Sequence, residues 1–489
     1  MKLDTSARMR NGARPLARQT LLSLLLGTIP LGAFADTQFA TVFDFAPDPA
    51  AGVGPRGGLI LATDGRFYGR RQNPQEVFRV NVNGSSFSSV HTFPMGEGGS
   101  GGVMEASDGK IYGSAFDASG GYLYRMDKNG SNYQKIVQFS SALAGIDPTS
   151  PPFEASDGFL YGPLTDGTIT GHGGFYKSSK DGTSVSTLLA LTGTAGGNPG
   201  AYDGSIGGSL IQVGGELFGV TPLGGANDAG VIFKITLTPS VGYTAIHEFT
   251  VSEGASAKVA LLHASDGRLY GVAQSGGNGG VITGFGTIFG INTDGTGFQV
   301  LHRFNDINGN DPSGSLIEAP DGKLYGLCFR GGAPGDNFGV AYRINKNGTG
   351  HSVIHKFRND TDAGFQPEGA LVRIGPSSFY GGTTFGPGDG TIYRIDTTQS
   401  SPAVFGKKKK RIPSIRRKVT VRGRATDDLD VASVFYRVRG KGGTRIAKGS
   451  GERWRIRLKP KRRRTVIKAF AIDFDLNNSP QRKFIVIKR

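Results

Sequence analysis

The chain has 489 residues, of which 79 are Gly and one is Cys, and its formal net charge is +17. This length exceeds one ordinary core and suits a large repeat domain joined to a smaller one. A single Cys excludes an intrachain disulfide, and we expect Cys328 to have a packing role rather than to be a reactive thiol.

Residues 1–35 have the pattern of a signal peptide. Five basic residues precede an apolar stretch at 21–31, which is too short to span a membrane. Ala33-Phe34-Ala35 is a small-x-small cleavage signal, so we expect a mature chain that begins at Asp36. An uncleaved anchor is the alternative. We expect an exported monomer without a transmembrane segment in the mature chain.

One pattern recurs seven times along the chain. Each unit has four short apolar runs, which in the sixth unit lie at 315–319, 323–327, 340–344 and 352–357. An aromatic-Gly pair marks the second run of each unit, and its aromatic residue is Tyr68, Tyr112, Tyr161, Phe218, Tyr270, Tyr325 or Tyr380. Because these aromatic residues recur in every unit, we expect them to pack between units rather than to stack on a ligand.

Asp-Gly pairs separate the first two runs of most units, and Asn-Gly or Asp-Gly pairs separate the last two. Such pairs tolerate the positive φ of a type I′ turn and indicate tight hairpins. Two hairpins make a four-stranded antiparallel sheet. Seven of these sheets predict an all-β fold with a seven-bladed β-propeller over residues 36–400. A parallel β-helix is the competing repeat fold, but its coils are shorter and lack paired hairpin turns.

The two ends of the repeat region are complementary. The seventh unit lacks its fourth run after Ile395, whereas an unassigned run of that pattern, Phe39–Phe45, precedes the first unit. We therefore expect the N-terminal strand to close the ring by pairing into the last blade, which removes free sheet edges.

The repeat Gly-Ser-Leu-Ile-Glu-Ala…Asp-Gly-Lys-Leu-Tyr-Gly, as it stands from Gly314 onward, resembles the GloVer tandem repeat of bacterial "choice-of-anchor" surface proteins. The resemblance covers about residues 36–397. It implies an exported, propeller-like bacterial protein and brings no established activity or catalytic residue. This chain departs from the family in lacking an evident C-terminal anchor.

Strand alternation places both hairpin turns of a unit on one face, and the second–third loops and the links between units on the other. The second group is long and variable, and variable loops on a rigid scaffold usually carry binding sites. We therefore expect the ligand on the long-loop face. The loops concerned are Ser114–Gly121, Pro163–Gly174, Thr221–Gly230, Ala273–Gly286 and Phe329–Gly339, with the links 192–208 and 305–314.

No catalytic, metal or cofactor site is predicted. His91, His247, His302 and His355 share one position of the fourth run, which puts them far apart on the rim and unable to share a zinc ion. The segment 306–311 resembles a calcium loop, but it lacks a bidentate Glu and is also a plain turn. Several unrepeated residues near long loops could line a polar mouth: Arg70, Arg71, His172, Arg330, Asp336 and Asp360.

The net charge is unevenly distributed. Residues 407–489 contain 28 Lys and Arg against 6 Asp and Glu, an excess of +22, and residues 1–35 contain 5 against 1, which leaves −9 for residues 36–406. We expect a basic linker at 401–412 and a basic domain at 413–489. Alternating segments there, such as 453–458, predict strands, and the stretch from Thr420 to Val438 resembles bacterial immunoglobulin-like modules.

The basic domain is expected to bind a polyanion, since alternate strand residues lie about 6.5–7 Å apart and a row of Arg could follow a charged polymer. Anionic polysaccharide, lipopolysaccharide and extracellular DNA are the expected partners, and export argues against intracellular nucleic acid. A solvated face that blocks edge pairing is the alternative. The predicted contact residues are Lys407, Lys408, Lys409, Lys410, Arg411, Arg453, Arg455, Arg457, Arg462, Arg463 and Arg464.

These features predict a non-enzymatic exported protein that binds a ligand or acts at the cell surface. The propeller would present the ligand-binding face, and the immunoglobulin-like β-sandwich would contact the anionic envelope or matrix. The alternative function is an extracellular carbohydrate-active hydrolase or lyase with its site at the propeller mouth. Propellers host both kinds of protein, so the fold alone does not decide between them.

Overall fold

The computed structural model describes residues 38–45, 53–140, 143, 146–165, 173–191, 210–278, 284–333, 336–359, 364–386 and 388–397, together with the backbone of eight strands between 403 and 487. The predicted signal peptide, most of the predicted linker, His172 and Asp360 lie outside the described residues. No helix in these ranges is long and apolar enough to cross a membrane.

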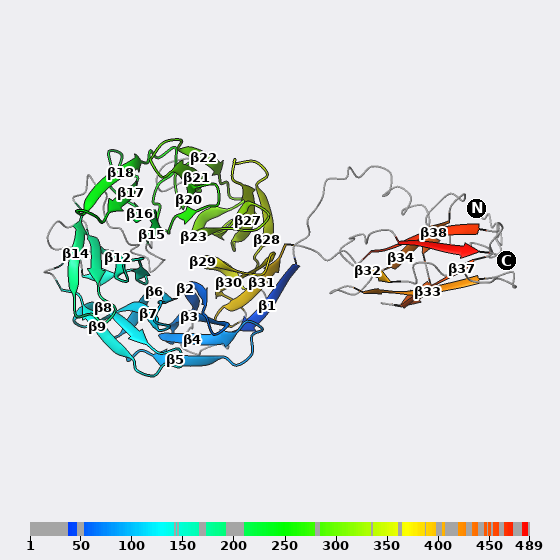
Figure 1. Ribbon diagram of the computed structural model, residues 1–489, viewed down its shortest axis with the longest axis horizontal. Helices are drawn as coiled ribbons and strands as arrows, with labels where there is room; N and C mark the ends of the chain where they lie inside the picture. Colours follow the sequence, from blue (N-terminus) through cyan, green and yellow to red (C-terminus); the bar gives the residue numbers. More distant parts are fainter. Residues whose placement is uncertain are drawn as a thin grey trace, which may run out of the picture.

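Seven antiparallel sheets surround a common centre and form the predicted seven-bladed propeller (Figure 1). The first blade consists of β2 (Val53–Leu61), β3 (Arg66–Asn73), β4 (Glu76–Asn81) and β5 (Ser88–Thr92). The second blade consists of β6 (Gly98–Glu105), β7 (Ile111–Asp117), β8 (Gly120–Met126) and β9 (Gln134–Gln138). The third blade consists of β10 (Asp147–Pro148), β11 (Phe153–Glu154), β12 (Leu160–Thr165), β13 (Gly174–Ser178) and β14 (Val185–Ala190).

The fourth blade consists of β15 (Ile211–Val213), β16 (Glu216–Thr221), β17 (Val231–Thr236) and β18 (Gly242–Glu248). The fifth blade consists of β19 (Leu262–His263), β20 (Arg268–Ala273), β21 (Thr287–Asn292) and β22 (Gln299–Arg303). The sixth blade consists of β23 (Asn310–Glu318), β24 (Lys323–Arg330), β27 (Val340–Asn345) and β28 (Ser352–Lys356). The seventh blade is β29 (Phe365–Ile374), β30 (Ser378–Phe385), β31 (Thr391–Asp396) and β1 (Gln38–Asp44). Within each blade the sheet runs from the inner strand at the centre to the fourth strand at the rim.

The N-terminal strand closes the ring, as predicted. β1 pairs antiparallel with β31, from Gln38 opposite Asp396 to Asp44 opposite Thr391. Phe39 lies between the last two blades, where it stacks on His355 with the ring centroids 4.0 Å apart and contacts Phe357 edge-on. The first and the last strands of the propeller, β1 and β31, therefore belong to the same sheet.

The hairpin turns differ from the predicted type. In the Asp-Gly pairs the φ is positive at the glycine alone, for example +75° at Gly65, whereas a type I′ turn needs two positive values. Gly65 N donates to Ala62 O over 2.9 Å, which describes a four-residue turn ending in a left-handed glycine. The Asp64 carboxylate fixes this turn, because it accepts hydrogen bonds from Arg66 N (3.2 Å) and the Tyr68 hydroxyl (2.9 Å).

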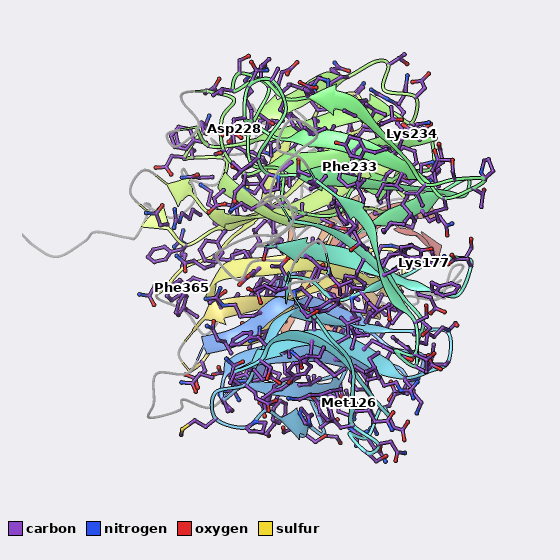
Figure 2. All side chains as sticks on the ribbon, turned by 90° about the vertical axis from the view of Figure 1, so that its left-hand side faces the viewer. Met126, Lys177, Asp228, Phe233, Lys234 and Phe365 are labelled. Carbon is purple, nitrogen blue, oxygen red and sulfur yellow. The ribbon has the colours of Figure 1, made fainter. Side chains whose placement is uncertain are left out.

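The two faces of the disc are distinct, as predicted. Figure 2 shows Asp228, from a second–third loop, and Phe365, the first residue of β29, on one side, and Lys177 and Lys234, near the third–fourth turns, on the other. One predicted loop is wrong: β7 extends to Asp117 and β8 begins at Gly120, so most of Ser114–Gly121 is a tight hairpin. Another, Phe329–Gly339, contains the short strands β25 (Gly332–Ala333) and β26 (Asp336–Asn337).

Glycines allow the inner strands to approach one another at the centre. Each inner strand of blades 1, 2, 6 and 7 has an irregular register there, as between Ser313 and Ile317 or between Glu368 and Val372. Gly314 and Gly369 have φ of +78° and +86°. A Cβ on Gly314 would lie 2.0 Å from Gly369 O, so a side chain at this point would separate neighbouring blades.

A polar contact joins consecutive blades on the short-turn face. The carboxylate of Glu105 accepts hydrogen bonds from Thr63 N (2.7 Å) and Thr63 Oγ1 (2.6 Å) of the previous blade, and it pairs with Lys128. We call this arrangement the seam lock. It recurs with Ser107, Glu154 and Lys180, and with Ser265, Glu318 and Lys346.

The strands beyond residue 402 form two further antiparallel sheets. One is β32 (Ala403–Phe405), β33 (Val419–Thr426), β37 (Arg453–Leu458) and β36 (Lys448–Ser450), and the other is β35 (Arg445–Ile446), β34 (Ser433–Val438), β38 (Arg464–Ile472) and β39 (Arg482–Ile487). β32 lies inside the predicted linker and pairs with β33. Two four-stranded sheets accord with a β-sandwich, while the immunoglobulin-like assignment stays a prediction.

Candidate ligand site at the centre of the propeller

One position of the inner strands differs in chemistry from blade to blade. It lies eight residues before the Asp of the first hairpin turn and immediately before the irregular stretch of the inner strand. We call the residues at this position the inner ring. In the described blades they are Arg56, Ser100, Thr149, Lys258, Ser313 and, by its register opposite Gly382, Glu368.

Charges from different blades meet within the inner ring. Arg56 Nη1 lies 3.6 Å from Glu368 Oε2, so the first and seventh blades are joined by an ion pair. The Thr384 hydroxyl also donates to Glu368 Oε2 over 3.2 Å. The Glu368 side chain is 4% exposed and that of Arg56 is 22% exposed. The carboxylate is therefore a buried anchor, and the guanidinium remains partly accessible.

Arg70 lies beside Arg56 on the neighbouring strand, directly opposite it in the β2–β3 register. Burial lowers the pKa of Arg70 to about 10, and the charge of Arg56 acts in the same direction. Its Nη2 donates to Gln75 Oε1 over 2.6 Å, while its buried Nε has no hydrogen-bond partner in the protein. Two guanidinium groups thus share one seam next to the single carboxylate of Glu368.

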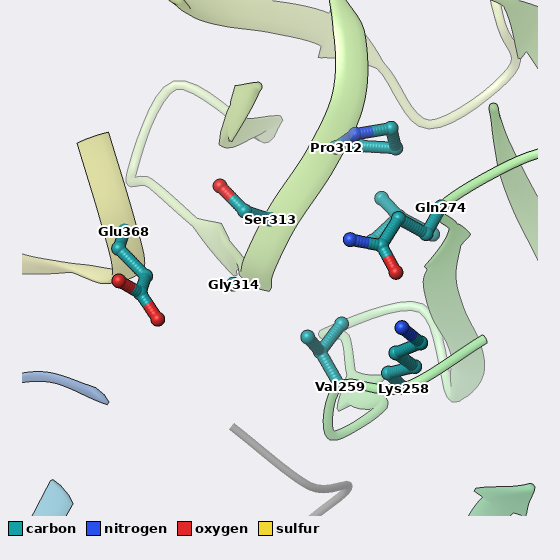
Figure 3. A pocket seen from close by; sticks show the side chains of 8 residues that line it. Lys258, Val259, Gln274, Pro312, Ser313, Gly314 and Glu368 are labelled. Carbon is teal, nitrogen blue, oxygen red and sulfur yellow. The ribbon is translucent and has the colours of Figure 1, made fainter. Parts of the chain in front are cut away.

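A small pocket opens between the fifth and sixth blades and includes three members of the inner ring. Its walls contain Lys258 and Gln274 on one side and Glu368 on the other, with Ser313 and Gly314 between them (Figure 3). Ser313 Oγ donates to Pro367 O over 3.0 Å, so its lone pairs face away from that bond. The pocket combines a cation, a carboxylate, a hydroxyl and an amide.

Among the residues predicted to line a polar mouth, Arg70, Arg71 and Arg330 are described, and they lie in different surroundings. Arg70 and Arg71 lie in strand β3 and are 5% and 8% exposed, so their predicted position near a loop is wrong. Arg71 pairs with Glu76 and with Asp389 at 3.2 Å each, in the seam that β1 closes. Arg330 is exposed at the end of β24, over the ring of Phe329. Of these three described residues, Arg70 belongs to the charged centre.

The histidines of the fourth strands are seam residues. His91, His247, His302 and His355 lie opposite Val77, Ile232, Ile288 and Ala341 of the third strands. Each stacks on a ring of the following blade, as His91 does on Tyr133 with the centroids 3.8 Å apart. Burial lowers the pKa of all four. Histidine recurs at this position because a neutral imidazole can pack by stacking between two blades.

The recurring tyrosines are buried packing residues, as predicted. Tyr68, Tyr112, Tyr161, Tyr270 and Tyr325 are each at most 1% exposed. Their hydroxyls donate to the Asp of their own hairpin turn.

Cys328 is fully buried, and burial raises the pKa of its thiol, which suits a packing role. At the start of the possible calcium loop, Asn308 N donates to Oδ1 of the preceding Asn305, and Asn305 N donates to Asn308 Oδ1. The described residues contain no group of three or more His, Cys, Asp or Glu that could hold a metal ion.

The basic residues predicted to bind a polyanion fall in two groups. Lys407, Lys408, Lys409, Lys410, Arg411, Arg462 and Arg463 lie outside the described residues. Arg453, Arg455 and Arg457 alternate along β37, and Arg464 begins β38. The register of β37 adds residues that the sequence did not suggest: Arg453 lies opposite Arg424, and Arg455 lies between Arg422 and Lys448.

Solved structures similar to this chain are propeller proteins of low sequence identity. The extracellular domain of a hybrid two component system from B. thetaiotaomicron aligns at 12% identity and a TM-score of 0.47, over 93% of this chain and 59% of that one. An oligogalacturonate lyase from Vibrio parahaemolyticus aligns at 13% identity and a TM-score of 0.45, over 74% and 97% of the two chains. This chain thus spans about three fifths of the length of the first of these proteins.

No curated protein matches the chain. The model of the Gloeobacter/Verrucomicrobia repeat matches residues 100–283 and 236–414, which together exceed half of the 489 residues. This match agrees with the repeat pattern and with the seven blades built from it. The chain belongs to the Gloeobacter/Verrucomicrobia repeat family.

Proposed function

We propose that the protein is an exported, non-enzymatic binding protein, in which the propeller holds a ligand and the basic C-terminal domain contacts an anionic polymer of the cell envelope or matrix. The pattern of residues 1–35 supports export to the periplasm, the cell surface or the medium. The basic domain is proposed to be an immunoglobulin-like sandwich, and the two four-stranded sheets support that assignment.

The observation that carries this proposal is a set of six basic residues on one sheet face. Antiparallel partners share a face, and alternate residues of a strand do so as well. The β33–β37–β36 register therefore places these residues together: Arg422, Arg424, Lys448, Arg453, Arg455 and Arg457. Val421, Trp454 and Ile456 occupy the opposite face.

Like charges directly opposite one another destabilise a sheet. Arg422 lies directly opposite Arg455, and Arg424 lies directly opposite Arg453, so each of these two pairs lowers the stability of the sheet. Strands about 4.8 Å apart, with residues about 6.5–7 Å apart along each strand, make a two-dimensional array of positive charge. A linear polyanion that lies across this array would relieve the repulsion, whereas a solvated face would retain it.

The test is retention of the full chain on immobilised heparin across a salt gradient. The triple replacement of Arg453, Arg455 and Arg457 by Gln should shift elution to clearly lower salt, because counterion release scales with the number of neutralised charges. The matched control is the triple replacement of Lys110, Lys177 and Lys234 by Gln, which removes equal charge from propeller ion pairs. Equal shifts in both variants, or retention insensitive to salt, would contradict the proposal.

A carbohydrate-active enzyme remains the second candidate, because the inner ring brings unrepeated charged residues to the centre. Glycoside hydrolases generally use two carboxyl groups about 5–10 Å apart. Among the described ring positions Glu368 is the single carboxylate, and it is 4% exposed and paired with Arg56. This favours binding over hydrolysis. Release of reducing ends or unsaturated products from acidic polysaccharides by the full chain would reverse the preference.

A further inference from the structure

We propose that the second sheet of the C-terminal domain, β35–β34–β38–β39, docks through one face on an anionic phospholipid surface. The sheet concerned is not the one proposed to bind a polyanion. The inference rests on the proposed packing of the two sheets into a sandwich, and it names a second partner for that domain.

The first sheet, β32–β33–β37–β36, has one apolar face. Its other face holds the six basic residues of the charged array, and the apolar face includes Val419, Val421, Trp454, Ile456 and Leu458. A sheet of this kind packs its apolar face in the core and leaves the charged face in water. The first sheet can therefore cover one face of the second sheet.

The second sheet is apolar on both faces. Alternate residues of a strand share a face, and so do antiparallel partners. One face includes Phe435, Ile446, Val466, Phe470, Ile485 and Ile487. The other includes Val434, Val438, Ile467, Phe484 and Val486. Packing on the first sheet uses one of these faces, and an apolar face is left over.

The basic residues indicate which face is left over. Arg437 lies opposite Lys468, and Lys468 lies opposite Lys483, so three cations form a row across neighbouring strands. This row belongs to the face of Phe435 and Phe470, which we call the row face. Lys468 is on the central strand β38, and burial of a cation without an acid is strongly unfavourable.

The basic residues of the other face lie at the edges of the sheet. Arg445 is on β35 and Arg482 is on β39, which are the two outer strands. A long basic side chain on an edge strand can reach water while its apolar stem stays in the core. The other face is therefore the better one to pack on the first sheet, and the row face is the one without a partner there.

The charge of the row face selects its partner. The four strands of the second sheet contain no Asp or Glu. In a two-fold dimer the same row would meet its own copy, and like charges would repel. An anionic phospholipid surface offers phosphates to the cations and acyl chains to the apolar residues.

The described part of the propeller offers no matching surface. Its exposed large apolar residues lie in different blades, as Phe116 does in the second, Val185 in the third and Phe385 in the seventh. Single apolar residues scattered in this way are ordinary on a protein surface and do not make a patch that could cover a sheet. The row face therefore calls for a partner outside the chain.

The experiment is flotation of the full chain with vesicles at physiological salt. One set is phosphatidylcholine alone, and the other is phosphatidylcholine with an equal part of phosphatidylglycerol. We expect the protein to float with the mixed vesicles only, and part of this binding to persist at high salt because apolar contact is not screened. Equal binding to both vesicle types, no binding to the mixed ones, or complete loss at high salt would overturn the proposal.

Two triple variants locate the binding. Replacement of Arg437, Lys468 and Lys483 by Gln should weaken binding to the mixed vesicles about tenfold or more and keep most of the heparin retention. The matched control replaces Arg453, Arg455 and Arg457 by Gln, which removes the same charge from the first sheet. It should keep most of the vesicle binding, and an equal loss in the two variants would overturn the proposal.

Single variants assign the faces. Phe470→Thr, on the row face, should reduce the binding that persists at high salt, and Thr keeps the preference for a strand. Ile467→Thr, on the other face, should lower the unfolding temperature more than Phe470→Thr does. The reverse order, or a dimer of the unaltered chain that Phe470→Thr dissociates, would overturn the proposal.

The two proposals for this domain fail separately. Loss of heparin retention with vesicle binding intact would contradict the polyanion proposal alone. Heparin retention without binding to the mixed vesicles would contradict the lipid proposal alone.

Discussion

The imidazole rings of His302 and His351 lie parallel across a blade seam, with centroids 3.8 Å apart and an interplanar angle of 5°. Phe304 contacts both rings edge-on. The amide nitrogen of Asn308 lies 3.2 Å from His302 Nε2, where it can donate if that nitrogen carries no proton. Two stacked rings in one apolar seam can remain together at neutral pH because both are uncharged.

Acid should weaken this seam first. Burial, and then the charge of His302, lowers the pKa of His351 to about 3, against about 6.5 in an unfolded chain. A lowered folded-state pKa gives stability that is complete above pH 6.5 and is lost as pH falls toward 3. Between pH 7 and pH 5 we expect a loss of about 1–2 kcal/mol from His351 in urea unfolding.

His351→Phe is the matched variant, because Phe298 holds the equivalent place against His247 in the preceding seam. The variant should lose less free energy of unfolding between pH 7 and pH 5 than the unaltered protein. An identical pH dependence in the two proteins would show that His351 does not carry the acid sensitivity.

Thr63, Glu105 and Lys128 make a second seam contact that can be measured. Burial alone would raise the pKa of Glu105, but its bonds to Lys128 and Thr63 outweigh that effect and lower the pKa. Lys128→Val leaves this mostly buried carboxylate without its cation and should lower the free energy of unfolding by about 1–3 kcal/mol.

The chain contains its own control for the seam lock. The first blade has Leu61 and Val82 at the positions of Glu105 and Lys128. Combining Glu105→Leu with Lys128→Val should therefore recover most of the loss, since the polar pair is replaced as a unit. A double variant as unstable as the sum of its parts would show that the two residues act independently.

Much of this fold was predictable from sequence because a local pattern was copied seven times. The period, the hairpins and the missing fourth strand follow from the apolar runs and the Gly pairs. The turn type was mispredicted because the Asp64 carboxylate bonds the Tyr68 hydroxyl four residues away, and propensity for positive φ does not contain that contact. Arg70 was mispredicted because β3 continues past the irregular stretch of β2 to pair with Arg56.

The inner ring had a sequence signal that went unused. Aligning the units eight residues before the turn Asp places Arg56, Lys258 and Ser313 in one column. Recognising that column as the centre required knowing that glycines such as Gly314 bring the inner strands together. The residues that contact each other across the seams were harder to predict from the sequence. His302 stacks on His351 of the next unit, and no pattern within one unit identifies that partner.

Removal of residues 38–45 should open the ring. The truncated chain loses the β1–β31 pairing and the Phe39 and Phe43 stacking contacts with the two neighbouring blades. It also exposes β31 as a free sheet edge, so we expect a lower unfolding temperature and concentration-dependent association. Differential scanning calorimetry against a chain that begins at Asp36 is the measurement, and equal unfolding temperatures would contradict the closure role of β1.

Arg71 tests the closing seam from its other side. Its guanidinium bonds Glu76 and Asp389 at 3.2 Å each, and the side chains of all three residues are at most 9% exposed. It also lies over the ring of Phe45, 4.9 Å from the centroid. Removing one partner from a buried ion pair costs about 3–5 kcal/mol, because the remaining charge stays buried. We expect a loss of that size for Arg71→Leu in urea unfolding.

Blade 5 suggests a companion variant, since Ala273 and Thr287 occupy the positions of Arg71 and Glu76 there. Arg71→Ala with Glu76→Thr should be less destabilised than Arg71→Ala alone, because the buried carboxylate of Glu76 is removed together with its cation. Full recovery is not expected, since Asp389 stays without the guanidinium. Arg66→Leu, at the other end of β3, controls for loss of a positive charge. A cost below about 1 kcal/mol for Arg71→Leu would mean that the seam is held by apolar packing around Phe45 rather than by this ion pair.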